Sequence, residues 1–455
     1  MSQNQPYFRT DGIRGRANQF PMTAEISMKI AMATACVLKE QKKESESTNR
    51  VVIGKDTRLS GYMFEHAITA GFLSIGLDVI QVGPIPTPGI AMLTRSMRAD
   101  LGVMITASHN KFQDNGFKFF DANSFKLDDG FQKRIETLIE SNFEDKLVLP
   151  EQCGKAKRLD DALGRYVEHV KSSFPKSQSL AGMKIVLDCA NGAAYKVAPQ
   201  ILWEMEAELI TIGDDPNGRN INEGCGATNT RALQCRVIQE GADIGIALDG
   251  DADRLIIVDE KGQVVDGDQL MAILAVTMKK QGKLAKNTLV ATVMSNMGME
   301  RFLEKENIHT VRTAVGDRAL IEEMRENKLS LGGEQSGHII VSEYSTTGDG
   351  LLAALQILSI LKNSNKRASE VLNVFMPYPQ LLKNIYYVTE DPLSKDEIQN
   401  AITLAQNNLA DNGRVIVRPS GTEPVIRVMA EGQDKNLIDN IVNTLCHTIE
   451  KVTQA

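Results

Sequence analysis

Short runs of apolar, β-branched residues alternate along most of the chain with stretches whose apolar positions have helical spacing. Runs at 51–54, 77–82 and 101–105 predict strands, with a helix at 64–75. The pattern is repeated by three further predicted strands: 184–188, 208–212 and 244–248. A third cycle starts with the strand 288–293 and ends in a helix over 350–361. Strands that are apolar on both faces are typical of parallel or mixed sheets covered by helices on both sides.

The pattern changes beyond about residue 375. Predicted strands at 386–388 and 414–417 bracket a helix, and a last helix is predicted over 437–452. This arrangement is typical of a smaller α+β domain. The sequence therefore predicts an α/β fold of three sandwich domains with mixed sheets, followed by an α+β domain. The predicted boundaries are 1–160, 161–262, 263–375 and 376–455.

Composition and charge narrow the class of protein. The 455 residues fit three or four domains, and 42% hydrophobic with 24% charged residues is typical of several globular cores. A net charge of −7 argues against nucleic acid as the main partner, because binding to a phosphate backbone requires a basic surface. No apolar run approaches the roughly 20 residues that span a bilayer, and the N-terminus carries no export signal. Six scattered cysteines favour buried thiols. The sequence predicts a cytoplasmic protein without nucleic-acid or membrane partners.

An acidic motif follows the predicted strand at 244–248. Its three aspartates stand at alternate positions: Asp249, Asp251 and Asp253. Three carboxylates on one short segment suit Mg²⁺, which takes hard oxygen ligands. A calcium-binding EF-hand also begins with alternating acids, but its sixth position falls on Arg254, where the loop requires glycine. The flanking segments predict strands rather than helices, which excludes the EF-hand. The remaining alternative is a solvated acidic turn.

Ser108 lies just after another predicted strand, in the sequence Thr-Ala-Ser-His-Asn at 106–110. It lacks the G-x-S-x-G context of hydrolases, and no histidine or aspartate has a recognisable triad spacing. A loop serine that caps the next turn is the alternative. However, residues 114–120 predict a turn and a returning strand, which brings Lys118 back beside Ser108. A serine that meets a three-carboxylate cation site is a candidate phosphate carrier.

Three glycine-containing loops offer further ligand contacts. Arg14 stands between glycines near the N-terminus, where it can hold an anion with two hydrogen bonds. The loop at 333–338 presents a carboxylate, a hydroxyl and an imidazole that suit sugar hydroxyls: Glu334, Ser336 and His338. A lone loop histidine is more often structural, which is the alternative for that ring.

The third loop, at 418–424, precedes a predicted strand. Together they provide two guanidinium groups, two hydroxyls and a glycine that permits a nest of backbone N–H groups, from Arg418, Ser420, Gly421, Thr422 and Arg427. Such a set is a good receptor for a phosphate dianion. The alternative is an ordinary β-turn.

These motifs, in this order, resemble the α-D-phosphohexomutase superfamily, and within it most closely the bacterial phosphoglucosamine mutases. The resemblance rests on the segments 8–15, 106–110, 249–254, 333–338 and 418–424, and it spans nearly the whole chain. It implies four domains around a central cleft. The first would carry the phosphoserine loop, the second the metal-binding loop, the third the sugar-binding loop and the fourth the phosphate-binding loop.

The resemblance also implies a role for each candidate residue. Ser108 would carry the phosphoryl group, and its oxygen would share Mg²⁺ with Asp249, Asp251 and Asp253. Arg14 and Lys118 would surround the transferring group, and His338 would lie near the reacting oxygen. The substrate would be bound by Arg254, Glu334, Ser336, Arg418, Ser420, Gly421, Thr422 and Arg427.

The implied activity is the interconversion of glucosamine 6-phosphate and glucosamine 1-phosphate through a 1,6-bisphosphate, which would supply UDP-N-acetylglucosamine and peptidoglycan precursors. The same mechanism on mannose or glucose phosphates is one alternative, and a catalytically silent phosphosugar sensor is another. A monomer and a homodimer are both compatible with the sequence. Three positions depart from the usual residues of the superfamily: Arg9, Lys111 and Ala314. The last replaces a lysine common in relatives, which bears on the sugar end of the site.

Overall fold

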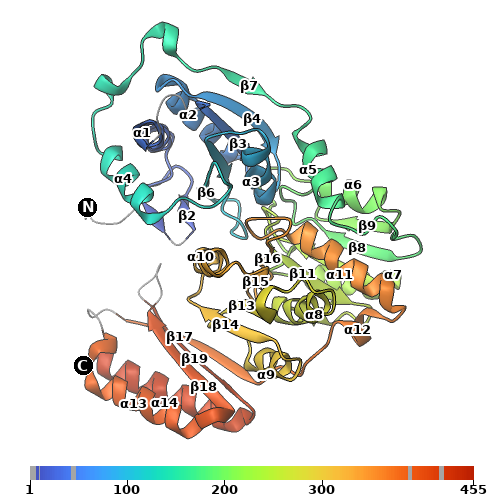
Figure 1. Cartoon of the computed structure of the whole chain (residues 1–455). Helices are drawn as coiled ribbons and strands as arrows, with labels where there is room; N and C mark the ends of the chain where they lie inside the picture. The colour runs from blue at the N-terminus through green and yellow to red at the C-terminus, as the bar shows by residue number, and fades with distance from the viewer. Residues whose placement is uncertain (1–6, 10, 42–47, 388–391, 420–424, 455) are drawn as a thin grey trace. The chain divides into compact units, whose positions relative to one another are not determined.

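The computed structural model describes residues 7–9, 11–41, 48–387, 392–419 and 425–454, which form two compact units (Figure 1). The first unit, residues 1–293 and 311–373, holds three mixed sheets, and the second, residues 294–310 and 374–455, holds an antiparallel sheet. The predicted fold class, three α/β sheets followed by a smaller α+β region, is confirmed. No helix within the described residues is long and apolar enough to cross a membrane.

The first sheet has seven strands in the order β1-β2-β6-β5-β3-β4-β7, of which β5, β3, β4 and β7 are parallel. Its strands are β1 (Phe8–Arg9), β2 (Gly12–Arg16), β3 (Arg50–Lys55), β4 (Asp78–Pro84), β5 (Leu101–Ile105), β6 (Asp114–Asp121) and β7 (Ala156–Arg158). Its helices are α1 (Ala24–Gln41), α2 (Ser60–Ser74), α3 (Thr87–Ser96) and α4 (Asp129–Ile139). The helices α1, α2 and α4 share one apolar core with the sheet. All five residues of β5 are buried, as its apolar sequence predicted.

The second sheet has the order β12-β11-β10-β8-β9, with β10, β8 and β9 parallel. Its strands are β8 (Lys184–Asp188), β9 (Glu208–Ile212), β10 (Ile244–Leu248), β11 (Leu255–Asp259) and β12 (Val264–Val265). The neighbouring helices are α5 (Ala162–Lys171), α6 (Val197–Glu204) and α7 (Arg231–Glu240). Because β10 and β11 form an antiparallel pair, the short acidic motif between them becomes a tight connection. The prediction of flanking strands, which excluded the EF-hand, is therefore correct.

The third sheet has the order β14-β13-β15-β16. Its strands are β13 (Thr288–Thr292), β14 (His309–Thr313), β15 (Leu331–Gly333) and β16 (Ile339–Val341). The helices of this region are α8 (Gly267–Lys280), α10 (Asp317–Asn327), α11 (Gly350–Ser364) and α12 (Ala368–Val371). Asp349 caps α11 by accepting from the N–H groups of Leu351 and Leu352, at 3.1 and 3.0 Å. The preceding N–H, of Gly350, donates to the carbonyl of Ala252 at 3.0 Å, so this helix begins against the acidic motif.

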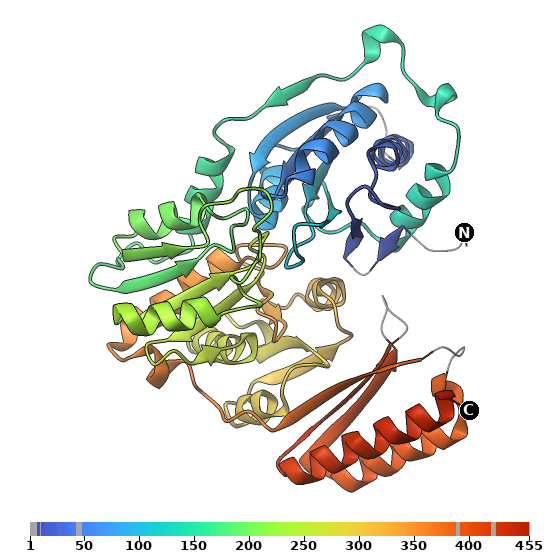
Figure 2. The same ribbon diagram turned by 180° about the vertical axis from the view of Figure 1, so that it is seen from behind.

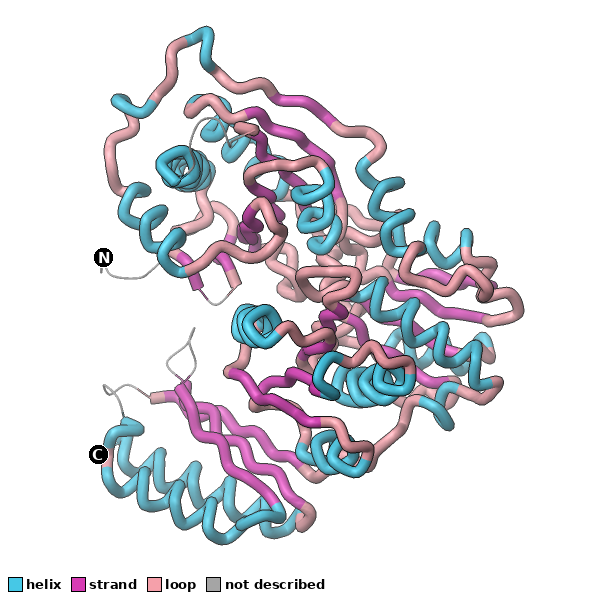
Figure 3. Tube along the Cα trace, viewed as in Figure 1, coloured by secondary structure: helices cyan, strands magenta, loops and turns pink. Residues whose placement is uncertain are grey.

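The second unit is built on the antiparallel sheet β17-β19-β18. Its elements are α9 (Met297–Lys305), β17 (Gln380–Tyr386), α13 (Asp396–Leu409), β18 (Gly413–Pro419), β19 (Val425–Gly432) and α14 (Lys435–Gln454). The helices α13 and α14 lie side by side on one face of the sheet (Figures 2 and 3). The strand predicted at 386–388 lies earlier in the chain, because Gln380–Tyr386 pairs along its whole length with β19; residue 388 is outside the described residues.

Candidate active site

Ser108 lies in the loop that follows β5, where its side chain is buried and points at the acidic motif. Its Oγ donates a hydrogen bond to Oδ2 of Asp249 at 2.7 Å. Its own N–H donates to Oγ1 of Thr106 at 2.9 Å, and its φ of +51° lies in the left-handed region. That conformation is disfavoured for a residue with a Cβ, so the surrounding contacts must hold it. The loops after β5 and β10 thus meet through one serine and one aspartate.

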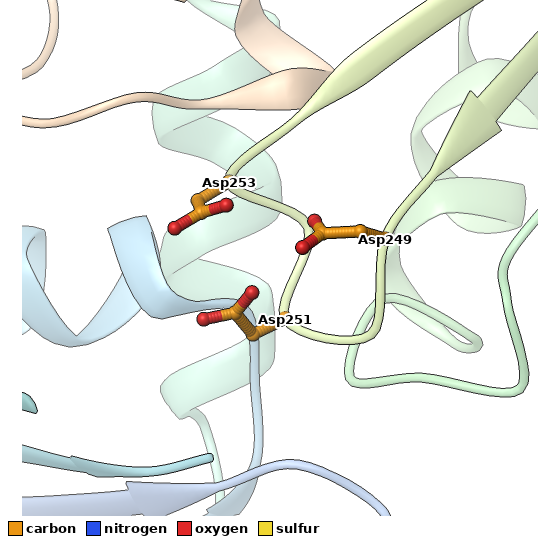
Figure 4. A group of neighbouring side chains, drawn as sticks. All are labelled: Asp249, Asp251 and Asp253. Atoms are coloured by element: carbon orange, nitrogen blue, oxygen red, sulfur yellow. The ribbon is translucent and has the colours of Figure 1, made fainter. Parts of the chain in front are cut away.

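The three aspartates turn their carboxylates toward a common space (Figure 4). All three are buried, and one oxygen from each lies within 4.8 Å of the others. Among the described residues, Oδ1 of Asp251 and Oδ1 of Asp253 have no hydrogen-bond partner. Buried carboxylate oxygens without a partner are unfavourable, and a hard divalent cation accepts this kind of donor. The residues present therefore fit a metal ion bound by carboxylates.

The pKa values of Asp249 and Asp253 are shifted in opposite directions. Burial, and then the charges of Asp253 and Asp251, raise the pKa of Asp249 well above its usual value. Burial would also raise the pKa of Asp253, but Lys118 and then His338 hold that pKa well below its usual value. The ionised form of Asp249 is therefore unfavourable until another cation joins the group.

Lys118 provides positive charge from β6, which runs antiparallel to β5 and places Lys118 opposite Met104. Its Nζ lies 2.8 Å from Oδ2 of Asp251 and 2.7 Å from Oδ2 of Asp253. The predicted returning strand is present, and it brings Lys118 to the aspartates that surround the serine loop. Burial alone would lower the pKa of Lys118, but Asp11 and these aspartates raise it well above its usual value, so the side chain stays charged.

Two arginines complete the cationic side of the site. Arg14, on β2, forms an ion pair with Asp11, and Arg254 lies with its Nε 3.8 Å from Oδ1 of Asp253. The Nε atoms of both arginines are buried and have no hydrogen-bond acceptor among the described residues. Buried guanidinium donors without an acceptor are typical of a site for an anion such as phosphate.

The loop between β15 and β16 places the predicted sugar-binding residues near the same site. Glu334 accepts from the N–H of Gly316 at 3.1 Å, and its other oxygen lies 3.4 Å from Oγ of Ser336. Both residues are half-buried. His338 is buried; its Nε2 accepts from the N–H of Gly348 at 3.2 Å, and its Nδ1 lies 3.8 Å from Oδ2 of Asp253. Its Nε2 is therefore occupied, whereas its Nδ1 faces the carboxylate of Asp253 at a distance longer than a hydrogen bond.

Arg418 and Arg427 lie directly opposite one another on β18 and β19. Their neighbours Val417, Ile426 and Val428 belong to the core with α13 and α14, so the arginines project from the other face of the sheet. Burial, and then the charge of Arg427, lower the pKa of Arg418. The buried Nε of Arg427 has no acceptor among the described residues. Like charges in opposition are destabilising, and an anion between them would relieve this. Ser420, Gly421 and Thr422 lie outside the described residues.

Several site residues were missed by the sequence analysis. Lys126 forms ion pairs with both Asp11 and Asp317, and Oγ1 of Thr87 donates to Oδ2 of Asp251. Nδ1 of His109 lies 3.4 Å from Oγ of Ser108, and burial, followed by the charges of nearby arginines, lowers its pKa to about 4. The imidazole next to the serine is therefore neutral at neutral pH. Asp11 was inside a recognised motif, but the distant partners of these residues left no signal in the sequence.

Comparisons with known proteins identify the family of the chain. Four segments match phosphoglucomutase/phosphomannomutase domains: alpha/beta/alpha domain I over residues 5–146, domain II over 164–262, domain III over 266–378 and the C-terminal domain over 385–447. A phosphoglucosamine mutase of Zymomonas mobilis is 55% identical and one of Xanthobacter autotrophicus 53% identical, each over 98% of this chain and 99% of the relative.

Solved structures agree on the fold. A phosphoglucomutase/phosphomannomutase family protein of Burkholderia thailandensis has a TM-score of 0.83 at 22% identity, covering 98% of this chain and 97% of its own. An N-acetylphosphoglucosamine mutase of Aspergillus fumigatus, in complex with GlcNAc-6P and magnesium, has a TM-score of 0.70 at 17% identity, covering 98% and 96%. With four matched domains and relatives that are more than half identical over nearly their full length, the chain belongs to the phosphoglucomutase/phosphomannomutase family of α-D-phosphohexomutases.

Proposed function

We propose that the chain interconverts glucosamine 6-phosphate and glucosamine 1-phosphate, with Ser108 as the phosphoryl carrier. The observation that carries this proposal is the 2.7 Å hydrogen bond from Oγ of Ser108 to Asp249. This bond lies within a group of buried carboxylates, two of whose oxygens have no hydrogen-bond partner in the part of the chain that the structure describes. The choice of sugar is supported by the relatives named phosphoglucosamine mutase, which are 53–55% identical. We place the reaction in the cytoplasm and take the substrate to be a small phosphosugar.

The reaction has two balanced half-steps. In the first, the bond between phosphorus and the Ser108 oxygen breaks and a bond from phosphorus to O1 of the substrate forms. The proton of the O1 hydroxyl ends on Oγ of Ser108. The resulting 1,6-bisphosphate then presents its 6-phosphoryl group, which returns to Ser108 while the serine proton ends on O6. Phosphoryl transfer depends chiefly on positioning and on neutralising charge, and Lys118, Arg14 and Arg254 provide fixed cations for it.

We propose Mg²⁺ as the cation of the three aspartates. Asp249, Asp251 and Asp253, together with an oxygen of phosphorylated Ser108, would hold it. When bound, it would offset the charge of the phosphate, which is about −1.5 to −2 near neutral pH. Glu334 and Ser336 would accept and donate to sugar hydroxyls, and His338 would keep Asp253 oriented. We also propose that the four loops belong to four domains, with boundaries near residues 160, 262 and 375.

The proposed substrate is tested by comparing glucosamine 6-phosphate with mannose 6-phosphate and glucose 6-phosphate. Each assay contains Mg²⁺ and a trace of the matching 1,6-bisphosphate, and kcat/KM is measured for each sugar. We expect the amino sugar to have the highest value. A higher value for mannose or glucose phosphate would leave the serine mechanism intact and change the substrate. No turnover of any sugar by phosphorylated, folded protein would favour a silent phosphosugar sensor.

Replacing Arg427 by glutamine tests the second anion site. We expect KM for the sugar phosphate to rise on the order of 100-fold with a smaller change in kcat, because a charge-assisted contact to the non-reacting phosphate is lost. The melting temperature of the ligand-free protein should not fall, since one of two opposed cations is removed. Arg414→Gln is the matched control on β18: its guanidinium pairs with buried Glu431, so it should lower the melting temperature and leave KM unchanged. An unchanged KM in Arg427→Gln would contradict the assignment.

A further inference from the structure

The loop that carries Ser108 is held from behind by two buried side chains that the mechanism above does not use. Arg58 follows the end of β3 and is completely buried. Its Nη2 donates to the carbonyls of Ser108 and Asn110, at 2.9 and 2.8 Å, and its Nη1 donates to the carbonyl of Lys111. One guanidinium therefore contacts three carbonyls of a single loop.

Asn222 reaches the same carbonyls from the loop between β9 and α7. Its Nδ2 lies 2.8 Å from the carbonyl oxygen of Ser108 and 2.9 Å from that of Asn110. The nitrogens Nη2 of Arg58 and Nδ2 of Asn222 each carry two hydrogens, so each can donate one to each carbonyl. Both carbonyl oxygens thereby receive two donors, which saturates them. The rotamer of the amide is fixed by the same contacts, because a flipped side chain would place Oδ1 against two carbonyl oxygens.

In this position the side chain of Asn222 makes only part of its possible hydrogen bonds. Its Oδ1 is buried and has no hydrogen-bond partner among the described residues, and its φ of +57° lies in the left-handed region. Asparagine tolerates that region, so the unpaired buried atom is the informative feature: it indicates that the geometry is kept for another purpose. Arg58 is better satisfied, since its Nε pairs with Oδ2 of Asp56 at 2.9 Å. The same carboxylate oxygen accepts from Oγ1 of Thr106 at 2.7 Å.

The acidic motif also packs against the carbonyl of Ser108, through Gly250. A Cβ added at Gly250 would meet the carbonyl oxygen of Ser108 at 2.6 Å and Nδ2 of Asn222 at 2.7 Å. Only glycine fits at that position without a shift of the backbone. The clamp formed by Arg58 and Asn222 thus fixes the distance between the serine loop and the aspartate loop.

We propose that Arg58 and Asn222 are positioning residues that turn the carbonyls of the serine loop away from the site, so that Oγ of Ser108 faces the aspartates. The inference rests on the proposed function, in which Ser108 receives and donates the phosphoryl group. Because Asn222 belongs to the loop between β9 and α7, it also ties the phosphoryl carrier to the region that supplies the aspartates. A displacement of about 1 Å in a reacting group can lower a rate about 100-fold.

The experiment compares Asn222→Ala, Asn222→Asp and Arg58→Lys with the wild-type chain. The first measurement is the single-turnover rate at which glucosamine 1,6-bisphosphate phosphorylates the unmodified protein, followed by intact mass. Steady-state kcat and KM and the melting temperature are measured in parallel. Asn220→Ala is the matched control, because this half-buried asparagine of the same loop contacts Asp215 and Asn217 instead. Arg50→Lys is the control for the arginine, since Arg50 donates to the carbonyl of Met97 away from the site.

We expect the single-turnover rate and kcat of Asn222→Ala to fall about 10- to 100-fold, with KM changed less than about twofold. Asn222→Asp should be at least as slow as Asn222→Ala, because its carboxylate would face two carbonyl oxygens. If the side chain only filled space, the aspartate variant would instead be faster than the alanine variant. Wild-type rates in Asn222→Ala, or a lower melting temperature without a lower kcat, would overturn the inference. If Arg58→Lys does not fold, the two Asn222 variants still test whether the clamp positions Ser108. A wild-type chain that cannot be phosphorylated would overturn the proposed function and this inference with it.

Discussion

Replacing Ser108 with alanine is expected to abolish phosphorylation of the chain and to lower kcat/KM on the order of 10⁵-fold or more, the size of effect seen when a nucleophile is removed. The loss has a simple cause, since alanine has no oxygen in place of the Oγ that lies 2.7 Å from Asp249. The fold should persist, because alanine and serine both carry a Cβ and have the same steric cost at a φ of +51°. The measurements are turnover of glucosamine 6-phosphate and intact mass after exposure to the bisphosphate.

Ser124→Ala is the control for this substitution. Ser124 is also a buried serine with a positive φ, in the turn after β6, and its hydroxyl donates to the carbonyl of Ala91. This variant should keep its activity and lose a little stability. If Ser108→Ala remained active, or if a different residue gained the phosphoryl group, the assignment of the carrier would be wrong.

Removal of the divalent cation by a chelator is expected to lower kcat on the order of 1,000-fold or more, because the charge of the transferring phosphoryl group is no longer offset. Mg²⁺ added back should restore activity and raise the melting temperature. Asp251→Asn should lose both responses, since its Oδ1 has no hydrogen-bond partner among the described residues and is free to bind the cation. Asp243→Asn is the control: Asp243 is an exposed carboxylate of the same sheet whose Oδ2 accepts from the N–H of Lys184.

The other two aspartates should differ in their effect on stability. Without metal, Asp249→Asn should raise the melting temperature, because burial and the neighbouring aspartates disfavour its ionised form. Asp253→Asn should lower the free energy of unfolding by about 1–3 kcal/mol, since Lys118 loses a charged hydrogen-bond partner at 2.7 Å. Both variants should lose activity and the stabilisation by Mg²⁺. Full activity without a divalent cation, or equal stability of the two variants, would contradict this description of the site.

Local sequence predicted much of the fold because burial and periodicity are local properties. The runs at 101–105 and 244–248 are strands buried along their whole length, and the helix predicted over 350–361 is part of α11. The strand predicted at 386–388 was placed too late, because the length of β17 is set by its pairing with a distant strand, β19. Strand pairing depends on partners that a single segment does not reveal.

The sequence by itself determined the chemistry available to this protein: a serine after a buried strand, three alternating aspartates and two arginines close to a glycine loop. It also determined the family, through the order of these motifs. Only the tertiary structure decided which groups meet. Lys118 pairs with aspartates more than 130 positions away, and Asn222 holds carbonyls more than 110 positions away. A side chain's type is encoded at its own position, whereas its charge state, burial and partners depend on how the sheets pack together.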